Sequence, residues 1–180
     1  RPEELVTASK DGFTREQLIR GEKKALCGFE FAYFSRPDST LEKKHVYEVR
    51  EDFGRNLGRE SDIAKKVDMV MSIPETADDA AYGLHEETGV RWERASRRHR
   101  YVTERAFILL QRERYSTIDR KVNILDRKIR GKSIAVVEDS IVRGDTTKVI
   151  VEKLRKHGAK KVHMFITFPR IISPCFYGID

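Results

Sequence analysis

Two adjacent carboxylates and a glycine-containing loop follow one another at 138–147 and could together bind a phosphorylated sugar. Glu138 and Asp139 end an apolar stretch, and Gly144 precedes two threonines where a helix is expected to begin. The free amides of a helix N-terminus and the helix dipole favour a phosphate, and a glycine lets the loop turn tightly around it. Carboxylate oxygens accept hydrogen bonds from ribose hydroxyls and are suitable ligands for Mg²⁺. The sequence therefore predicts a sugar-phosphate and Mg²⁺ site here.

The elements that would position these residues alternate between apolar strands and amphipathic helices. A helix is also expected to begin at Thr14 and to carry residues 16–24, and Gly89 and Gly158 are expected to end two of the later helices. Strands separated by helices predict an α/β fold with a mainly parallel sheet flanked by helices, and ligands beyond the carboxyl ends of the strands. The expected strands are 29–34, 68–73, 134–137 and 162–167, and the expected helices are 46–59, 77–88 and 146–157.

Composition excludes several classes of protein. The chain has 180 residues, of which 39% are apolar and 36% are charged, enough for one domain with a core. It lacks the run of about 18 apolar residues that a membrane span needs, and its first residues do not resemble a secretory signal. Two cysteines make neither a disulfide framework nor a zinc module, and the five histidines lack metal-ligand spacing. We expect a cytoplasmic protein without a membrane partner.

The positive charge is concentrated in one segment. The whole chain carries a net charge of +7, whereas residues 91–132 contain fourteen basic and five acidic residues, a net of +9. A solvated basic surface would explain this excess, and so would a segment that closes over a polyanion. Both explanations remain open at this point.

The loop reads D-S-I-V-R-G at 139–144, and here the sequence resembles a known family. It is similar to the phosphoribosyl pyrophosphate (PRPP) motif of type I phosphoribosyltransferases, and specifically of the glutamine amidophosphoribosyltransferases. Further blocks resemble this family in the family's order, so the resemblance covers most of residues 27–180. These blocks are 29–39, 73–76, 100–102, 121–123 and 174–180.

The resemblance implies a type I phosphoribosyltransferase-like fold and a reaction of de novo purine synthesis. Ammonia attacks C1 of PRPP, pyrophosphate leaves and 5-phosphoribosylamine forms, with Mg²⁺ as cofactor. It also implies roles for individual residues. Arg100, Tyr101 and Lys121, in a flexible loop at about 98–121, would be catalytic. Glu138 and Asp139 would bind the ribose and the metal. The other substrate-binding residues would be Glu75 and Thr76 at the pyrophosphate, and Ser140, Ile141, Val142, Arg143, Gly144, Asp145, Thr146 and Thr147 at the 5-phosphate.

The ends of the chain depart from the family. Residues 1–28 resemble a linker or N-terminal extension and 29–180 a phosphoribosyltransferase core, so we expect truncation at both ends, without the family's glutaminase domain. Cys27 and Cys175 resemble two of four iron–sulfur ligands of some members. A cluster would therefore need a longer parent chain, and within this chain two buried structural thiols are favoured.

Other departures keep a second function open. Thr103, Glu104 and Arg105 differ from the family's loop, Ala77 replaces a common serine or glycine, and Asp145 places a carboxylate beside the phosphate cradle. The alternative to an enzyme is a non-catalytic PRPP-binding or nucleotide-binding regulatory domain. The expected partners are PRPP, ammonia derived from glutamine, purine nucleotides as inhibitors and other copies of the chain. A nucleic-acid partner is disfavoured.

Overall fold

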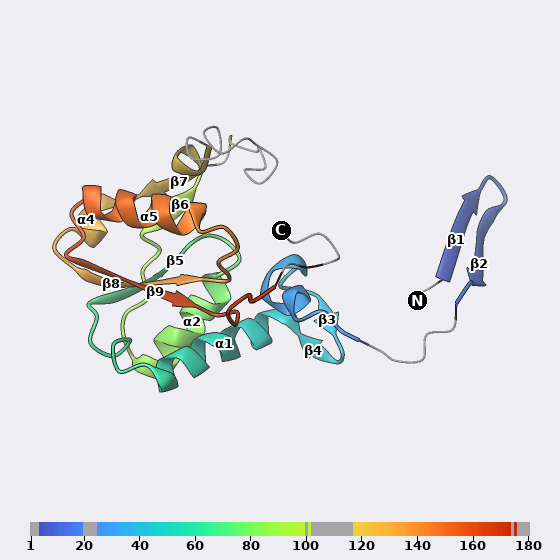
Figure 1. Cartoon of the computed structure of the whole chain (residues 1–180), viewed down its shortest axis with the longest axis horizontal. Helices are drawn as coiled ribbons and strands as arrows, with labels where there is room; N and C mark the ends of the chain where they lie inside the picture. The colour runs from blue at the N-terminus through green and yellow to red at the C-terminus, as the bar shows by residue number, and fades with distance from the viewer. Residues whose placement is uncertain (1–3, 20–24, 100, 102–116, 174, 176–180) are drawn as a thin grey trace.

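A parallel sheet of three strands lies at the centre of the protein in a computed structural model (Figure 1). The strands are β5 (Met69–Ser72), β8 (Ser133–Glu138) and β9 (Lys161–Ile166), in the order β5-β8-β9. Helices cover both faces of this sheet, so the predicted α/β class with a parallel sheet is confirmed. The structure describes residues 4–19, 25–99, 101, 117–173 and 175.

The two faces of the sheet bury different side chains because successive residues of a strand point in opposite directions. On one face, Met69, Met71 and Ile134 pack with Ile150 and Leu154 of α5 (Asp145–Lys156). On the other face, Val70, Ala135 and Val137 pack against α2 (Asp78–Thr88). Residues 69–71 and 134–137 are apolar throughout because both faces of these two strands are covered.

The helix α1 (Val46–Glu60) packs against α2 and lies beyond it from the sheet (Figure 1). Two glycines allow this close approach. A Cβ on Gly54 would lie 1.9 Å from the backbone oxygen of Ala80, and one on Gly83 would lie 2.0 Å from that of Glu51. Any larger residue at either position would force the two helices apart.

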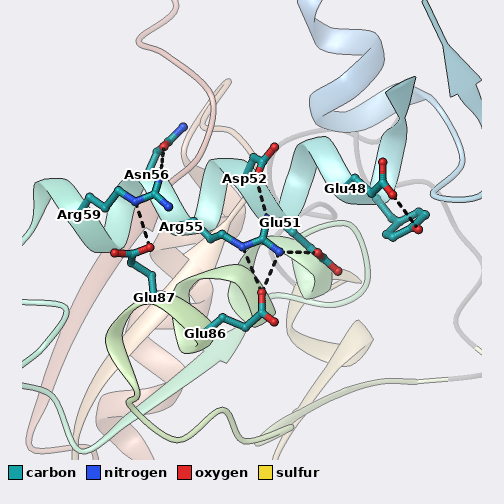
Figure 2. Close-up of polar contacts among 9 residues, drawn as sticks. Glu48, Glu51, Asp52, Arg55, Asn56, Arg59, Glu86 and Glu87 are labelled. Atoms are coloured by element: carbon teal, nitrogen blue, oxygen red, sulfur yellow. Dashed lines mark hydrogen bonds and ion pairs between the residues drawn. The ribbon is translucent and has the colours of Figure 1, made fainter. Parts of the chain in front are cut away.

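Ion pairs join the exposed sides of the same two helices (Figure 2). Arg55 contacts Glu51 and Asp52 of its own helix and Glu86 of α2, with N–O distances of 2.8, 2.6 and 2.8 Å. A second pair joins Arg59 to Glu87 at 3.0 Å. The helix pair is therefore fixed by glycines inside and by arginines outside.

A two-stranded antiparallel ribbon lies above the sheet. It consists of β6 (Ser96–Arg98) and β7 (Val122–Ile124), and Arg98 faces Val122 in the register. The amide of His99 donates to the backbone oxygen of Lys121 at 2.7 Å, which extends this pairing by one step. Residues 117–121 are helical, and α4 (Asp126–Ile129) follows the ribbon.

Two expected elements are wrong. Residues 29–34 were expected as a strand, but Glu30–Phe34 is a π-helix, η1. The guanidinium of Arg50 donates to the backbone oxygens of Phe31 and Ser35, both at 2.8 Å, and this long-range contact stabilises the turn. The helix expected from Thr14 is replaced by a hairpin of β1 (Glu4–Ser9) and β2 (Gly12–Gln17), because the turn ahead of Gly12 (φ 123°) lets the two segments pair.

The remaining expected elements are confirmed. The helices 46–59, 77–88 and 146–157 and the strands 68–73, 134–137 and 162–167 differ from the structure by one or two residues at their ends. Gly89 ends α2 with φ 70°, and Gly158 lies one residue beyond the C-cap of α5 with φ 92°. A small hairpin of β3 (Thr40–Leu41) and β4 (Lys44–His45) precedes α1. Within the described residues, we find no helix with the length and apolarity to cross a membrane.

Candidate functional site

Glu138 and Asp139 lie at the carboxyl end of β8, the central strand, as the sequence predicts. Each carboxylate accepts a hydrogen bond from a hydroxyl of the following segment. Thr147 Oγ1 donates to Glu138 Oε2 at 2.6 Å, and Ser140 Oγ donates to Asp139 Oδ1 at 2.5 Å. Only 7% of Glu138 is exposed. The two carboxylates are therefore held in place before any ligand arrives.

Burial disfavours the charged form of both carboxylates. It raises the pKa of Glu138 to about 7; the hydrogen bond from Thr147 opposes this rise, and the charge of Asp139 adds to it. Burial also raises the pKa of Asp139, against the hydrogen bond from Ser140 and the positive charge of Arg50. A cation at this position would favour both ionised forms, which suits a site that takes up a metal with its substrate.

The segment 140–144 leads from these carboxylates to the N-terminus of α5. Gly144 is the N-cap residue and has φ 77°, a left-handed conformation that glycine adopts without strain. No side-chain hydrogen bond caps this end of the helix. Ile141, Val142 and Arg143 are exposed. The predicted phosphate cradle corresponds to this loop and the start of α5, and its binding of a phosphate stays a prediction.

A second loop, 73–77, leaves the neighbouring strand β5 at the same edge of the sheet. The amide of Ile73 donates to the backbone oxygen of Val137 at 2.9 Å, so this loop starts directly beside the end of β8. Glu75 is exposed, Thr76 is partly buried, and the peptide bond between Pro74 and Glu75 is cis. Parallel neighbours thus bring the predicted pyrophosphate loop next to the predicted ribose and phosphate site.

The ribbon β6–β7 brings the two ends of the predicted flexible loop together beside loop 73–77. Arg98 Nη1 lies 3.8 Å from Glu75 Oε2. Tyr101 is 88% exposed, and Lys121 is held through its backbone oxygen. Of the three expected catalytic residues, Arg100 lies outside the described residues, as do Thr103, Glu104 and Arg105 of the altered loop. The catalytic roles stay predictions.

Arg50 and Asp79 also lie at this site, although the sequence pattern did not single them out. Arg50 is only 3% exposed, on the inner face of α1, and its charge acts on both Asp79 and Asp139. Burial raises the pKa of Asp79, in the first turn of α2, and Arg50 opposes this. One signal was available: Arg50 lies four residues after Val46 and four before Gly54, on a face whose other members are apolar or small.

The described residues contain no group of three or more His, Cys, Asp or Glu side chains that could hold a metal ion by themselves. Two adjacent carboxylates nevertheless fit Mg²⁺, which commonly binds one or two protein carboxylates together with substrate phosphates. Cys27 and Cys175 do not fit an iron–sulfur cluster within the described chain, since two thiolates fall short of four ligands. Both thiols are exposed, so their expected burial is wrong.

The chain is similar to known proteins over nearly its whole length. It is 38% identical over 164 residues to an amidophosphoribosyltransferase of Archaeoglobus fulgidus, covering 91% of this chain and 35% of the relative. An enzyme of the same name from Bacillus subtilis is 36% identical over 179 residues, covering 99% of this chain and 37% of that relative. The chain thus spans about a third of the length of the curated relatives it matches. No protein-family model matches it.

Solved structures agree with this similarity. A glutamine PRPP amidotransferase from B. subtilis, complexed with ADP and GMP, superposes with a TM-score of 0.79 at 36% identity, covering 99% of this chain and 39% of that one. A structure described as the allosteric regulatory enzyme of purine biosynthesis gives the same TM-score and identity, with 38% of that chain covered. The fold is therefore that of one part of these proteins.

Proposed function

We propose that this chain carries out the phosphoribosyl transfer of the amidophosphoribosyltransferases. Nearly its whole length is homologous to about a third of the length of these enzymes. It would bind PRPP with Mg²⁺, and ammonia would displace pyrophosphate from C1 to give 5-phosphoribosylamine, in purine biosynthesis. Ammonia would come from glutamine through a glutaminase activity outside residues 1–180. Residues 29–180 would form the catalytic core, and the working form would be a homo-oligomer.

One observation carries this proposal. The acidic end of β8, where the predicted phosphate cradle begins, lies directly beside loop 73–77, which follows the neighbouring strand. PRPP has a phosphate at one end, a pyrophosphate at the other and ribose hydroxyls between them. Two loops that would bind anions, with two carboxylates at the end of β8 beside them, support a ligand of this kind.

The chain's own residues would act chiefly through electrostatics and positioning. The amides around Gly144 and the hydroxyl of Thr146 would hold the 5-phosphate, and Glu138 and Asp139 would accept hydrogen bonds from the ribose hydroxyls. As pyrophosphate departs, the ribose ring gains positive charge, which the same carboxylates would stabilise. Arg100, Tyr101 and Lys121 would come to the pyrophosphate and exclude water.

Mg²⁺ would be held by Glu138 and Asp139 together with the substrate, and it would neutralise charge on the pyrophosphate. Because burial raises the pKa of both carboxylates, they would be loaded most readily when the pH is high enough to ionise them.

The proposal is tested by measuring pyrophosphate formation from PRPP, Mg²⁺ and ammonium with the purified chain. We expect steady-state turnover, and we expect Asp139→Asn to reduce it by at least about 100-fold. Glu152→Gln, which changes an exposed carboxylate of α5, serves as the matched control. Tight PRPP binding without turnover would refute the enzymatic function, and unchanged PRPP affinity in Asp139→Asn would refute the site.

A second function is favoured by one observation: a relative with the same fold was solved with ADP and GMP. The chain would then bind purine nucleotides at the same edge of the sheet, either as inhibitors of the enzyme or as a non-catalytic regulatory domain. Competition between GMP and PRPP in a binding assay, with or without turnover, separates these two cases.

A further inference from the structure

We propose that the ion pair between Arg98 and Glu75 occupies the place of the pyrophosphate in the free protein, and that Arg98 leaves Glu75 to bind the pyrophosphate when the ligand arrives. This inference rests on the proposed function. It adds a further pyrophosphate ligand outside the matched family motifs and gives Glu75 a role beyond its backbone. In the free protein, the charge of Glu75 would partly neutralise the charge of Arg98.

Both partners are positioned by the backbone beside the same strand end. Ser96 Oγ donates to the backbone oxygen of Ser72 at 2.7 Å in a buried hydrogen bond, which ties β6 to the end of β5. Arg98 lies two residues beyond Ser96, on the same face of β6, and Glu75 lies three residues beyond Ser72. The contact is therefore set by the fold and brings a cation to the loop that would receive the pyrophosphate.

The ion pair between Arg98 and Glu75 is weak enough for a ligand to replace Glu75. Its atoms are 3.8 Å apart, and the Arg98 and Glu75 side chains are 47% and 71% exposed. Water screens such a pair, so its contribution is small. A pyrophosphate carries more negative charge than one carboxylate and offers several acceptor oxygens to a guanidinium fork. Arg98 would therefore bind the pyrophosphate more strongly than it binds Glu75. If the Arg98–Glu75 pair were buried, breaking it would cost more free energy.

The exchange has a consequence for Glu75. Its carboxylate holds Arg98 away from the ligand and also repels an arriving anion. Removing the charge should therefore tighten pyrophosphate binding in two ways. The gain from releasing Arg98 requires Arg98, whereas the gain from removing repulsion by Glu75 does not. Measuring the Glu75→Gln effect with and without Arg98 therefore separates the two.

The test is calorimetric titration of the whole chain with magnesium pyrophosphate. We expect Arg98→Gln to weaken binding about tenfold, as loss of a charge-assisted hydrogen bond does. We expect Glu75→Gln to tighten it about threefold to tenfold. In the double variant the gain from Glu75→Gln should shrink, because no arginine remains to be released.

Arg97→Gln is the matched control. Arg97 is the exposed neighbour on β6, its side chain contacts its own strand at the oxygen of Ser96, and strand alternation directs it to the other face. If Arg98→Gln and Arg97→Gln lost equal affinity for magnesium pyrophosphate, the inference would be overturned. It would also be overturned if Glu75→Gln raised this affinity equally in the presence and in the absence of Arg98. If wild type binds neither magnesium pyrophosphate nor PRPP, the proposed function itself fails.

Discussion

Replacing Glu138 by glutamine should stabilise the metal-free protein at alkaline pH while impairing its site. Glutamine keeps the shape of the side chain and an oxygen that can accept the hydrogen bond from Thr147, and it removes the charge that burial disfavours. The gain should appear only where Glu138 of the wild type is ionised. The expected effect is therefore a difference in unfolding free energy that changes with pH.

The sign follows from the direction of the pKa shift. Burial raises the pKa of Glu138 from 4.5 to about 7, so between these values the folded protein keeps a proton that the unfolded chain has lost. Raising the pH through this interval favours unfolding. Stability from this group is fully present below pH 4.5 and is lost by about pH 7. With each pKa unit equivalent to about 1.4 kcal/mol, the loss comes to about 3 kcal/mol.

The assay is urea unfolding of wild type and Glu138→Gln in chelator at about pH 5 and about pH 8.5. We compare the free energy of unfolding of Glu138→Gln with that of wild type at each pH. We expect this difference to favour Glu138→Gln by about 2 to 3 kcal/mol more at about pH 8.5 than at about pH 5. Glu152→Gln, with its exposed carboxylate, should show no such dependence. A Glu138→Gln difference that is equal at both pH values would refute the argument from burial.

Four further substitutions, in three groups, test the framework around the site. Gly54→Ala and Gly83→Ala should each lower the free energy of unfolding by about 2 to 3 kcal/mol, because the new methyl group meets the backbone of the facing helix. Arg50→Met should lower it by about 3 kcal/mol, because two backbone oxygens lose their buried donor. Arg55→Ala should lower the urea midpoint at low salt, and the loss should shrink at about 1 M NaCl, where charge pairs are screened. Urea titrations measure all three effects.

Gly58→Ala is the control for the glycine substitutions. Its new methyl group would meet side-chain atoms of Glu87 and Thr88 at 2.9 to 3.1 Å rather than backbone, and alanine favours the helix, so we expect a smaller loss than in Gly54→Ala. If Gly58→Ala destabilises as much as Gly54→Ala, the close backbone approach is not the cause.

The sequence predicted the elements of the parallel sheet because their signals are local. An apolar run, a proline or glycine stop and a helical period identified β5, α2, β8 and α5 without tertiary information. The edge of the sheet where Glu138 and Asp139 lie then follows from the parallel topology. These features depend on neighbouring residues, which a sequence displays directly.

Two of the failures depend on distant residues. The alternating aromatic run at 29–34 favours a strand, but Arg50, 19 residues beyond Phe31, holds the turn through its carbonyl oxygens. Phe29 and Ala32, three residues apart, are then buried. The electrostatic role of Arg50 at Asp139 was hidden for the same reason, because it arises only when α1 and the end of β8 come together.

Loops 73–77 and 139–144 follow strands that are hydrogen-bonded neighbours, and this pairing sets the distance at which the two loops begin. The spacing of paired strands, about 4.8 Å, is set by backbone hydrogen bonds and is the same whatever side chains the strands carry. Substitutions around 73–77 or 139–144 can strengthen or weaken either loop, but they leave the offset between the strands unchanged. The distance between the starting points of the two loops is therefore a property of the backbone, whereas the side chains of the loops would decide how tightly a ligand binds.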